Sequence, residues 1–93
     1  MLPSVDRDVI LGAMARFDHE LRGTHQWTGW EQNRVHKYAI RENTQLYPVK
    51  QIVSMATGIP VSEFRGGVGA GQANQYVGER GFDVVPLRSR NPD

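Results

Sequence analysis

Apolar residues near the N-terminus recur at helical spacing, at offsets of 0, 4, 7 and 11: Ile10, Met14, Phe17 and Leu21. Residues with this spacing fall on one face of a helix. Either Ser4 or Asp6 can cap the first turn, and Gly23 supplies the left-handed residue with which many helices end. The pattern predicts an amphipathic helix over residues 5–22, followed by a polar loop over residues 23–33 that carries both tryptophans.

The segment after this loop has a strand-like composition. Residues 35–40 include β-branched and aromatic residues that predict a strand, Asn43 indicates a turn, and residues 46–47 predict a short returning strand. Residues 34–47 are therefore predicted to form a β-hairpin. Charged or polar side chains fall on both faces of the first strand, which is typical of an edge strand and equally of a ribbon that presents side chains to a groove.

A second helical stripe begins directly after the hairpin, with apolar residues at offsets of 0, 3, 4 and 7: Val49, Ile52, Val53 and Ala56. Pro48 suits the first position of this helix, where its missing N–H costs nothing, and Gly58 suits the end. Residues 62–64 are expected to make one short turn, and the glycine-rich residues 66–71 are expected to form a loop.

The last part of the chain predicts one more helix and one more strand. Within a helix over residues 72–80, the inward positions are Ala73, Tyr76 and Val77. Residues 82–85 alternate as a strand, with Pro86 at its end or at a sheet edge. The order α-β-β-α-α-β predicts an α+β fold, with a small antiparallel sheet of about three strands and three helices packed on one face. We expect one domain over residues 1–87 and a polar tail or linker over residues 88–93.

Composition argues against several classes of function. The 93 residues contain no cysteine, which excludes a disulfide scaffold and the common structural zinc patterns and favours a reducing compartment. No apolar run approaches the roughly 20 residues that span a membrane, and no signal peptide is recognisable, so we expect a cytoplasmic protein without membrane contact. A His-x-x-x-His pair, a nucleophile elbow and a Walker loop are also missing. We therefore expect no catalytic residues, no metal, no cofactor and no enzymatic activity.

Charge is unevenly distributed, although the formal net charge is only +1. Residues 1–32 hold three arginines against five acidic residues, a net of −2, whereas residues 33–65 hold five basic residues against two acidic ones, a net of +3. A basic middle segment is typical of a nucleic-acid-binding face. An ordinary solvated surface gives the same pattern, so charge alone leaves both interpretations open.

Aromatic and basic residues are interleaved in this part of the chain, and they form the candidate DNA-binding set: Trp27, Trp30, Arg34, His36, Lys37, Tyr38, Tyr47, Lys50 and Arg65. Basic side chains suit phosphates and base edges, and exposed aromatic rings stack on bases. The tryptophans have a core position as their alternative. Tyr47 can instead pack inward at a strand-to-helix corner, and Arg65 can instead pair with Glu63. Lys50, at the start of a helix, either binds an external anion or is simply solvated.

Several of these residues belong to short motifs that resemble one family: Trp27-x-x-Trp30, His36-Lys37-Tyr38, Tyr47-Pro48-Val49-Lys50, Phe64-x-Gly66-Gly67, Asn74 and Gly81-Phe82. Together they resemble the N-terminal head domain of McrA-like type IV restriction endonucleases, which are modification-dependent and carry a C-terminal HNH nuclease domain. The resemblance covers about residues 10–87. It implies a duplex DNA-binding module that recognises 5-methylcytosine or hydroxymethylcytosine and leaves cleavage to C-terminal domains of the same polypeptide.

Reading a 5-methyl group asks for an apolar contact in the major groove of DNA. The candidates for that contact are Trp30, Tyr38 and Tyr47. The candidates for phosphates or base edges are Arg34, Lys37, Lys50 and Arg65. We expect direct reading in the DNA groove, because a chain of this length is expected to lack a pocket deep enough for an extruded base.

The same aromatic residues also fit a second class of function. An interaction or dimerisation module of a larger HNH-type protein would use Trp27, Trp30 and Phe64 as an apolar patch. Aromatic anchors dominate interfaces of that kind. The two hypotheses differ in whether binding responds to salt and DNA or to protein concentration.

Overall fold

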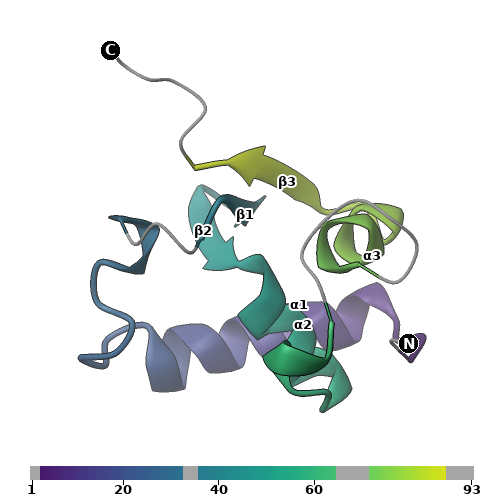
Figure 1. The fold of residues 1–93 in the computed structure, drawn as a ribbon, viewed down its shortest axis with the longest axis horizontal. Helices are drawn as coiled ribbons and strands as arrows, with labels where there is room; N and C mark the ends of the chain where they lie inside the picture. Colours follow the sequence, from purple (N-terminus) through teal and green to yellow (C-terminus); the bar gives the residue numbers. More distant parts are fainter. Residues whose placement is uncertain (1–2, 33–35, 65–71, 88–93) are drawn as a thin grey trace.

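The computed structural model describes residues 3–32, 36–64 and 72–87 (Figure 1). Its elements follow one another as α1 (Arg7–Arg16), a π-helical turn (Phe17–Leu21), a 3-10 turn (Trp30–Gln32), β1 (Tyr38–Glu42), β2 (Gln45–Pro48), α2 (Val49–Thr57), a second 3-10 turn (Val61–Glu63), α3 (Ala73–Glu79) and β3 (Asp83–Pro86). The predicted α+β class and the order α-β-β-α-α-β are confirmed. The glycine-rich residues 66–71 lie outside the described residues.

The sheet has the strand order β2-β1-β3 and is antiparallel throughout. Ile40 of β1 is opposite Tyr47 on one side and Val84 on the other. The interpretation of the first strand as an edge strand is therefore wrong. Its polar residues lie toward its ends, whereas the consecutive Ala39 and Ile40, which a strand points to opposite faces, are both fully buried.

The edges of the sheet are formed by β2 and β3. Pro86 belongs to β3, where a residue without an N–H is tolerated because one side of the strand has no partner strand in the sheet. Arg41 at the end of β1 is placed opposite Asp83 of β3, and their side chains form an ion pair at 2.8 Å. One further backbone bond extends this pairing, from the amide of Leu87 to the carbonyl of Lys37 at 2.9 Å.

A two-residue turn joins β1 to β2. Because Glu42 pairs with Gln45, the turn consists of Asn43 and Thr44, and both have a positive φ, of 53° and 66°. This is the requirement of a type I′ turn, whose twist matches that of the strands. Asn tolerates the left-handed region, but a β-branched threonine does so only with strain.

Glycines and a proline set the helix ends. Gly58 ends α2 with φ of 79°, and Gly81 follows α3 with φ of 85°, as the sequence predicted for both. Pro48 is the last residue of β2 and the N-cap of α2, one position earlier than expected. The proline ring fixes φ at about −65°, which is compatible both with the end of a strand and with a helix N-cap. Pro48 has a φ of −71°.

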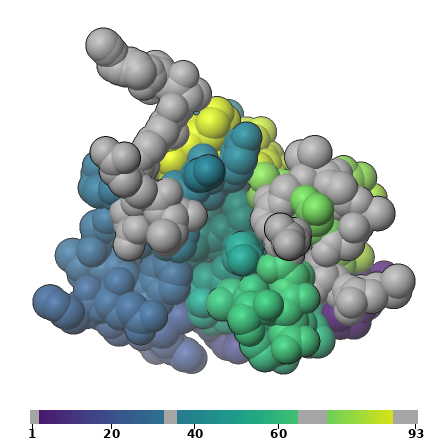
Figure 2. All heavy atoms as spheres, in the orientation of Figure 1, coloured from purple at the N-terminus to yellow at the C-terminus, as the bar shows by residue number. Residues whose placement is uncertain are grey.

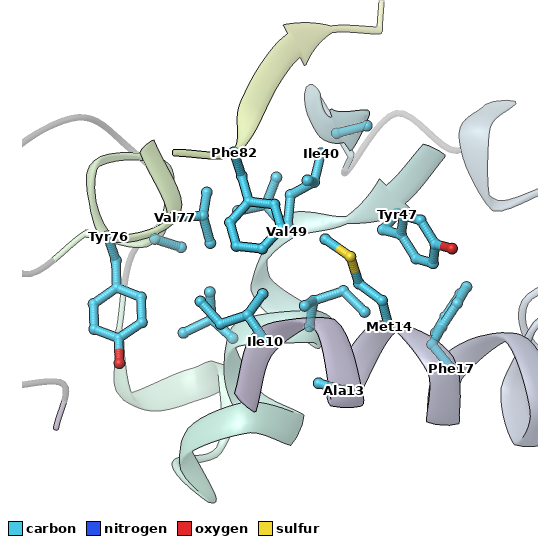
Figure 3. Packing of buried hydrophobic residues seen from close by; sticks show 14 of the residues in the cluster. Ile10, Ala13, Met14, Phe17, Ile40, Tyr47, Val49, Tyr76, Val77 and Phe82 are labelled. Atoms are coloured by element: carbon cyan, nitrogen blue, oxygen red, sulfur yellow. The ribbon is translucent and has the colours of Figure 1, made fainter. Parts of the chain in front are cut away.

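The core lies between the helices and the sheet. Ile10, Ala13, Met14 and Phe17 form the buried stripe along α1 and its π-helical continuation. In Figure 3 Ile10 and Met14 point from α1 toward the side of Val49 and Phe82, and Phe17 lies beside Tyr47. α1 packs against α2, and α2 packs against α3 and the first two strands. Figure 1 shows α1 and α2 on one side of the sheet and α3 next to β3.

Residues 22–32, which follow the π-helical turn, fold back as a series of turns and lie in the blue lobe at one end of the molecule in Figure 2. Thr24 organises this segment: its carbonyl accepts the amides of Trp27 and Thr28 at 3.2 and 3.0 Å, and the carbonyl of Trp27 then accepts the amide of Trp30 at 3.2 Å. These turns bring both tryptophans toward the core. None of the described helices has the length and apolar content to cross a membrane.

Replacing Thr44 by glycine is expected to stabilise the fold by about 1 kcal/mol, because glycine adopts the left-handed conformation without steric cost. Chemical denaturation of both proteins measures the difference. Asn43→Gly is the matched control and should change the free energy of unfolding much less. A Thr44→Gly protein no more stable than the parent would contradict the strain assigned to this turn.

Candidate functional site

The surface is hollowed by a groove of about 640 Å³. Five described parts of the chain line it: the turns before β1, the start of β1, the first turn of α2, the 3-10 turn Val61–Glu63 and the N-terminal end of α3. In Figure 2 the blue lobe and the green region of α2 lie on either side of the teal strand region. Groups that are separated in the sequence by nearly fifty residues thus share one concave surface, from Gln26 to Asn74.

The groove has a buried floor and an exposed rim. Trp27, Val49 and Asn74 are buried and form the floor. His36, Lys50 and Gln51 are half-buried along its sides, and the exposed rim consists of Gln26, Lys37, Tyr38 and Val61. Five residues of the predicted DNA-binding set therefore meet here: Trp27, His36, Lys37, Tyr38 and Lys50.

The groove is positively charged. Lys37 and Lys50 are the only lysines of the chain, and both line it. Neither forms an ion pair with any residue that the structure describes; Lys50 Nζ lies 5.7 Å from the ring centroid of Phe64. No aspartate or glutamate occurs among the described lining residues. Two cations without a protein counter-ion, in one hollow, favour an external anion as the ligand.

The arginines behave differently, because all five described arginines have protein partners. Arg22 and Arg41 form ion pairs with Asp18 at 2.6 Å and with Asp83 at 2.8 Å. The others bind backbone carbonyls: Arg7 binds that of Arg80 at 2.9 Å, Arg16 that of Met55 at 2.9 Å, and Arg80 that of Val5 at 2.7 Å. These arginines stabilise the fold through contacts with other protein groups, whereas both lysines line the groove without a described protein counter-ion.

A cluster of aromatic rings supports the floor. Trp27 meets Phe17 edge-on, with ring centroids 5.3 Å apart, and meets Trp30 at 6.3 Å. His36 lies against both indoles, at 5.6 Å from Trp27 and 5.3 Å from Trp30. Burial among these rings lowers the pKa of His36 below its ordinary value of 6.5. The imidazole is therefore neutral at pH 7 and adds a ring, not a charge, to the groove.

The tryptophans do not form an exposed stacking platform. Trp27 is 8% exposed and Trp30 is 4% exposed, so the expectation that at least one of them is exposed for stacking or wedging is wrong and the core alternative holds. A small core gains more from burying two large rings than from leaving one in water. Trp27 still contributes to the groove floor, whereas Trp30 lines only a second hollow of about 210 Å³ beside it.

Tyr47 packs inward at the strand-to-helix corner, which was the alternative to a DNA contact. Its hydroxyl donates to Asp18 at 2.6 Å, and its ring lies 6.1 Å from that of Phe17 and 4.9 Å from the Arg22 guanidinium carbon. Burial and the bond to Asp18 raise the pKa of Tyr47 to about 12. It cannot contact a methyl group on DNA in this position. Of the remaining candidates, Arg34 and Arg65 lie outside the described residues.

One polar residue of the floor was missed as a site residue. Asn74 is only 6% exposed, and its side-chain amide makes no hydrogen bond to a described residue. Its signal in the sequence was weak: a polar residue directly after Ala73, on a helix whose inward positions are otherwise apolar. Gln26, Gln51 and Val61 were missed as well, because nothing local in the sequence places them in a hollow.

The described side chains offer no constellation for metal chemistry, since no group of three or more histidine or acidic residues comes together among them. The groove brings together an apolar and aromatic floor, three side-chain amides and two cations. Comparison with family models, curated proteins and solved structures finds no match to this chain.

Acid is expected to destabilise the protein partly through His36. The unfolded chain takes up a proton near pH 6.5 and the folded chain only at lower pH, so the free energy of unfolding falls as pH drops through this interval. His36→Gln should lose that part of the dependence in denaturation measured between pH 8 and pH 5. His25→Gln, at an exposed histidine, is the matched control and should retain it. Equal pH profiles for the parent and His36→Gln would refute this assignment.

Proposed function

We propose that this domain binds duplex DNA through the groove, with Lys37 and Lys50 on its phosphates. The observation that carries the proposal is that both lysines lack a protein counter-ion and line one concave surface without a described acid. Phosphate contacts of this kind position a protein on DNA and supply most of the salt-dependent affinity.

The start of α2 supports the same ligand. Lys50 lies in the first turn of this nine-residue helix, and the N-cap Pro48 provides no side-chain hydrogen bond. The first N–H groups of a helix and its positive dipole end attract anions. A phosphate at this end of the groove would neutralise Lys50 and satisfy those donors together.

An apolar rim supports recognition of a modified base. Tyr38 and Val61 are 46% and 39% exposed, and they are two of the three large apolar side chains that the described surface leaves this open. Both line the groove beside the lysines. An exposed apolar side chain next to phosphate-binding cations is what contact with a 5-methyl group requires.

These features and the motif resemblance support one specific role. We infer that the domain recognises 5-methylcytosine or hydroxymethylcytosine in duplex DNA, as the head domain of a McrA-like type IV restriction endonuclease would. Cleavage would belong to C-terminal domains of the same polypeptide, and a cytoplasmic location follows from DNA as the ligand. The alternative role as a protein-interaction module has less support, because Trp27 and Trp30, two of its three aromatic anchors, are buried.

Lys37→Ala and Lys50→Ala should each weaken binding to plain and modified duplexes by the same factor. Each should also lower the slope of log affinity against log salt by about 1, because one phosphate contact is lost. Fluorescence anisotropy at several salt concentrations measures both effects. Arg41→Ala is the matched control: it removes one exposed positive charge that is paired with Asp83 outside the groove, and affinity should remain unchanged. Undiminished binding by both lysine variants would refute the groove as the DNA site.

Tyr38→Ala should reduce the preference for 5-methylcytosine and leave affinity for the plain duplex nearly unchanged, since only the apolar contact is lost. The preference is measured as the ratio of dissociation constants for matched methylated and plain duplexes. Val9→Ala changes the third exposed apolar residue, which is on α1 away from the groove, and should keep the ratio. Equal loss of affinity on both duplexes would assign Tyr38 to general DNA binding.

A further inference from the structure

The amide of Asn74 is an unusual feature of the groove. The residue lies on the floor at 6% exposure, and its side chain has no hydrogen-bond partner among the described residues. Among the described residues only Trp30 Nε1 is both fully buried and unpaired, so the small exposed part of Asn74 includes its amide, which is open to the groove. A side chain that keeps a donor and an acceptor free at the bottom of a hollow is suited to a ligand that supplies both partners.

The hollow has room for such a ligand. Sites for small molecules typically measure roughly 300–1,000 Å³, and this groove measures about 640 Å³. A volume does not test the expectation that a chain of this length lacks a pocket deep enough for an extruded base, and the base uptake proposed below departs from that expectation. The lobe before β1 and the first turn of α2 both contribute residues to the groove.

The walls have the chemistry of a base-binding site. His36 and Tyr38, which are half-buried and exposed, provide rings on which a planar base can stack, and Lys37 and Lys50 provide charges for the phosphates beside it. We propose that the groove takes up one nucleobase unstacked from the duplex and that the Asn74 amide hydrogen-bonds to its Watson–Crick edge. This inference rests on the proposed DNA-binding function and extends it to the mode of recognition.

Cytosine matches the amide. On its Watson–Crick edge an amino donor lies next to a ring-nitrogen acceptor, so the carboxamide oxygen of Asn74 can accept from the first while the carboxamide N–H donates to the second. A substituent at carbon 5 leaves both groups unchanged. Asn74 would therefore hold cytosine with or without its modification, and Tyr38 and Val61 at the rim would add the preference for the modified form.

The test uses duplexes that carry 2-aminopurine beside a single 5-methylcytosine. Uptake of the cytosine removes one stacking neighbour, so the parent protein should raise the fluorescence several-fold on binding. Asn74→Leu, which has a similar shape, should lose most of this rise and bind at least tenfold more weakly. Gln75→Leu is the matched control on the same helix, because Gln75 bonds to Glu79 and does not line the groove; it should behave as the parent.

A second measurement needs no variant. Mispairing the 5-methylcytosine weakens its hold in the duplex, so base uptake predicts tighter binding to the mispaired duplex than to the paired one. Thermal unfolding of Asn74→Leu provides a further readout: its midpoint should be close to that of the parent, because the side chain of Asn74 has no hydrogen bond to a described residue that the change would remove. A marked fall in the midpoint would give Asn74 a structural role and overturn its assignment as a ligand-binding residue.

The outcomes separate the two proposals. Salt-dependent binding with unchanged fluorescence and no preference for the mispaired duplex would overturn base uptake and leave DNA binding in place. A full fluorescence rise with Asn74→Leu would overturn the role of Asn74. No binding to any duplex at low salt would overturn the proposed function and base uptake with it.

Discussion

The contact between Phe17 and Trp27 connects the core to the groove. Phe17 is fully buried at the end of the α1 stripe and also meets the ring of Tyr47, so it joins the long helix to the second strand. Trp27 presents one edge to Phe17 and another part to the groove. Trp27 belongs to a loop, so its ring keeps its position by packing against the rigid ring of Phe17. The position of the groove floor therefore depends on this contact. His36 is in turn held between Trp27 and Trp30.

Positive charge is divided between two tasks. The described arginines bind carboxylates and backbone carbonyls, for which their planar, multiply donating guanidinium group is suited. The lysines carry compact charges on flexible chains and have no protein counter-ion among the described residues. A net charge of +1 conceals this division, since paired charges cancel locally and unpaired ones do not. Among the described arginines and lysines, the two that bind neither a carboxylate nor a backbone carbonyl of a described residue therefore both line the groove.

Two polar groups without a described hydrogen-bond partner lie in the same region. Trp30 Nε1 is fully buried without a partner among the described residues, and the amide of Asn74, which is not fully buried, makes no hydrogen bond to a described residue. Proteins usually satisfy buried groups such as Trp30 Nε1, and exceptions often occur where stability is reduced for a function. The two residues border neighbouring hollows that share Trp27 and His36. This grouping agrees with a surface that is completed by a ligand.

The sequence alone determined the elements, because helices, turns and hairpins depend on local periodicity and on residues such as Gly58, Gly81 and Asn43. It also brought Lys37, Tyr38 and Lys50 into one candidate set. Only the tertiary structure decided that β1 is central, that Trp27 and Trp30 are buried, that Tyr47 turns inward to Asp18 and that Asn74 reaches a groove. These outcomes depend on which segments pack together across long stretches of chain, and no local pattern encodes that choice. Periodicity predicts which face of an element is buried, whereas a hollow exists only where several elements meet.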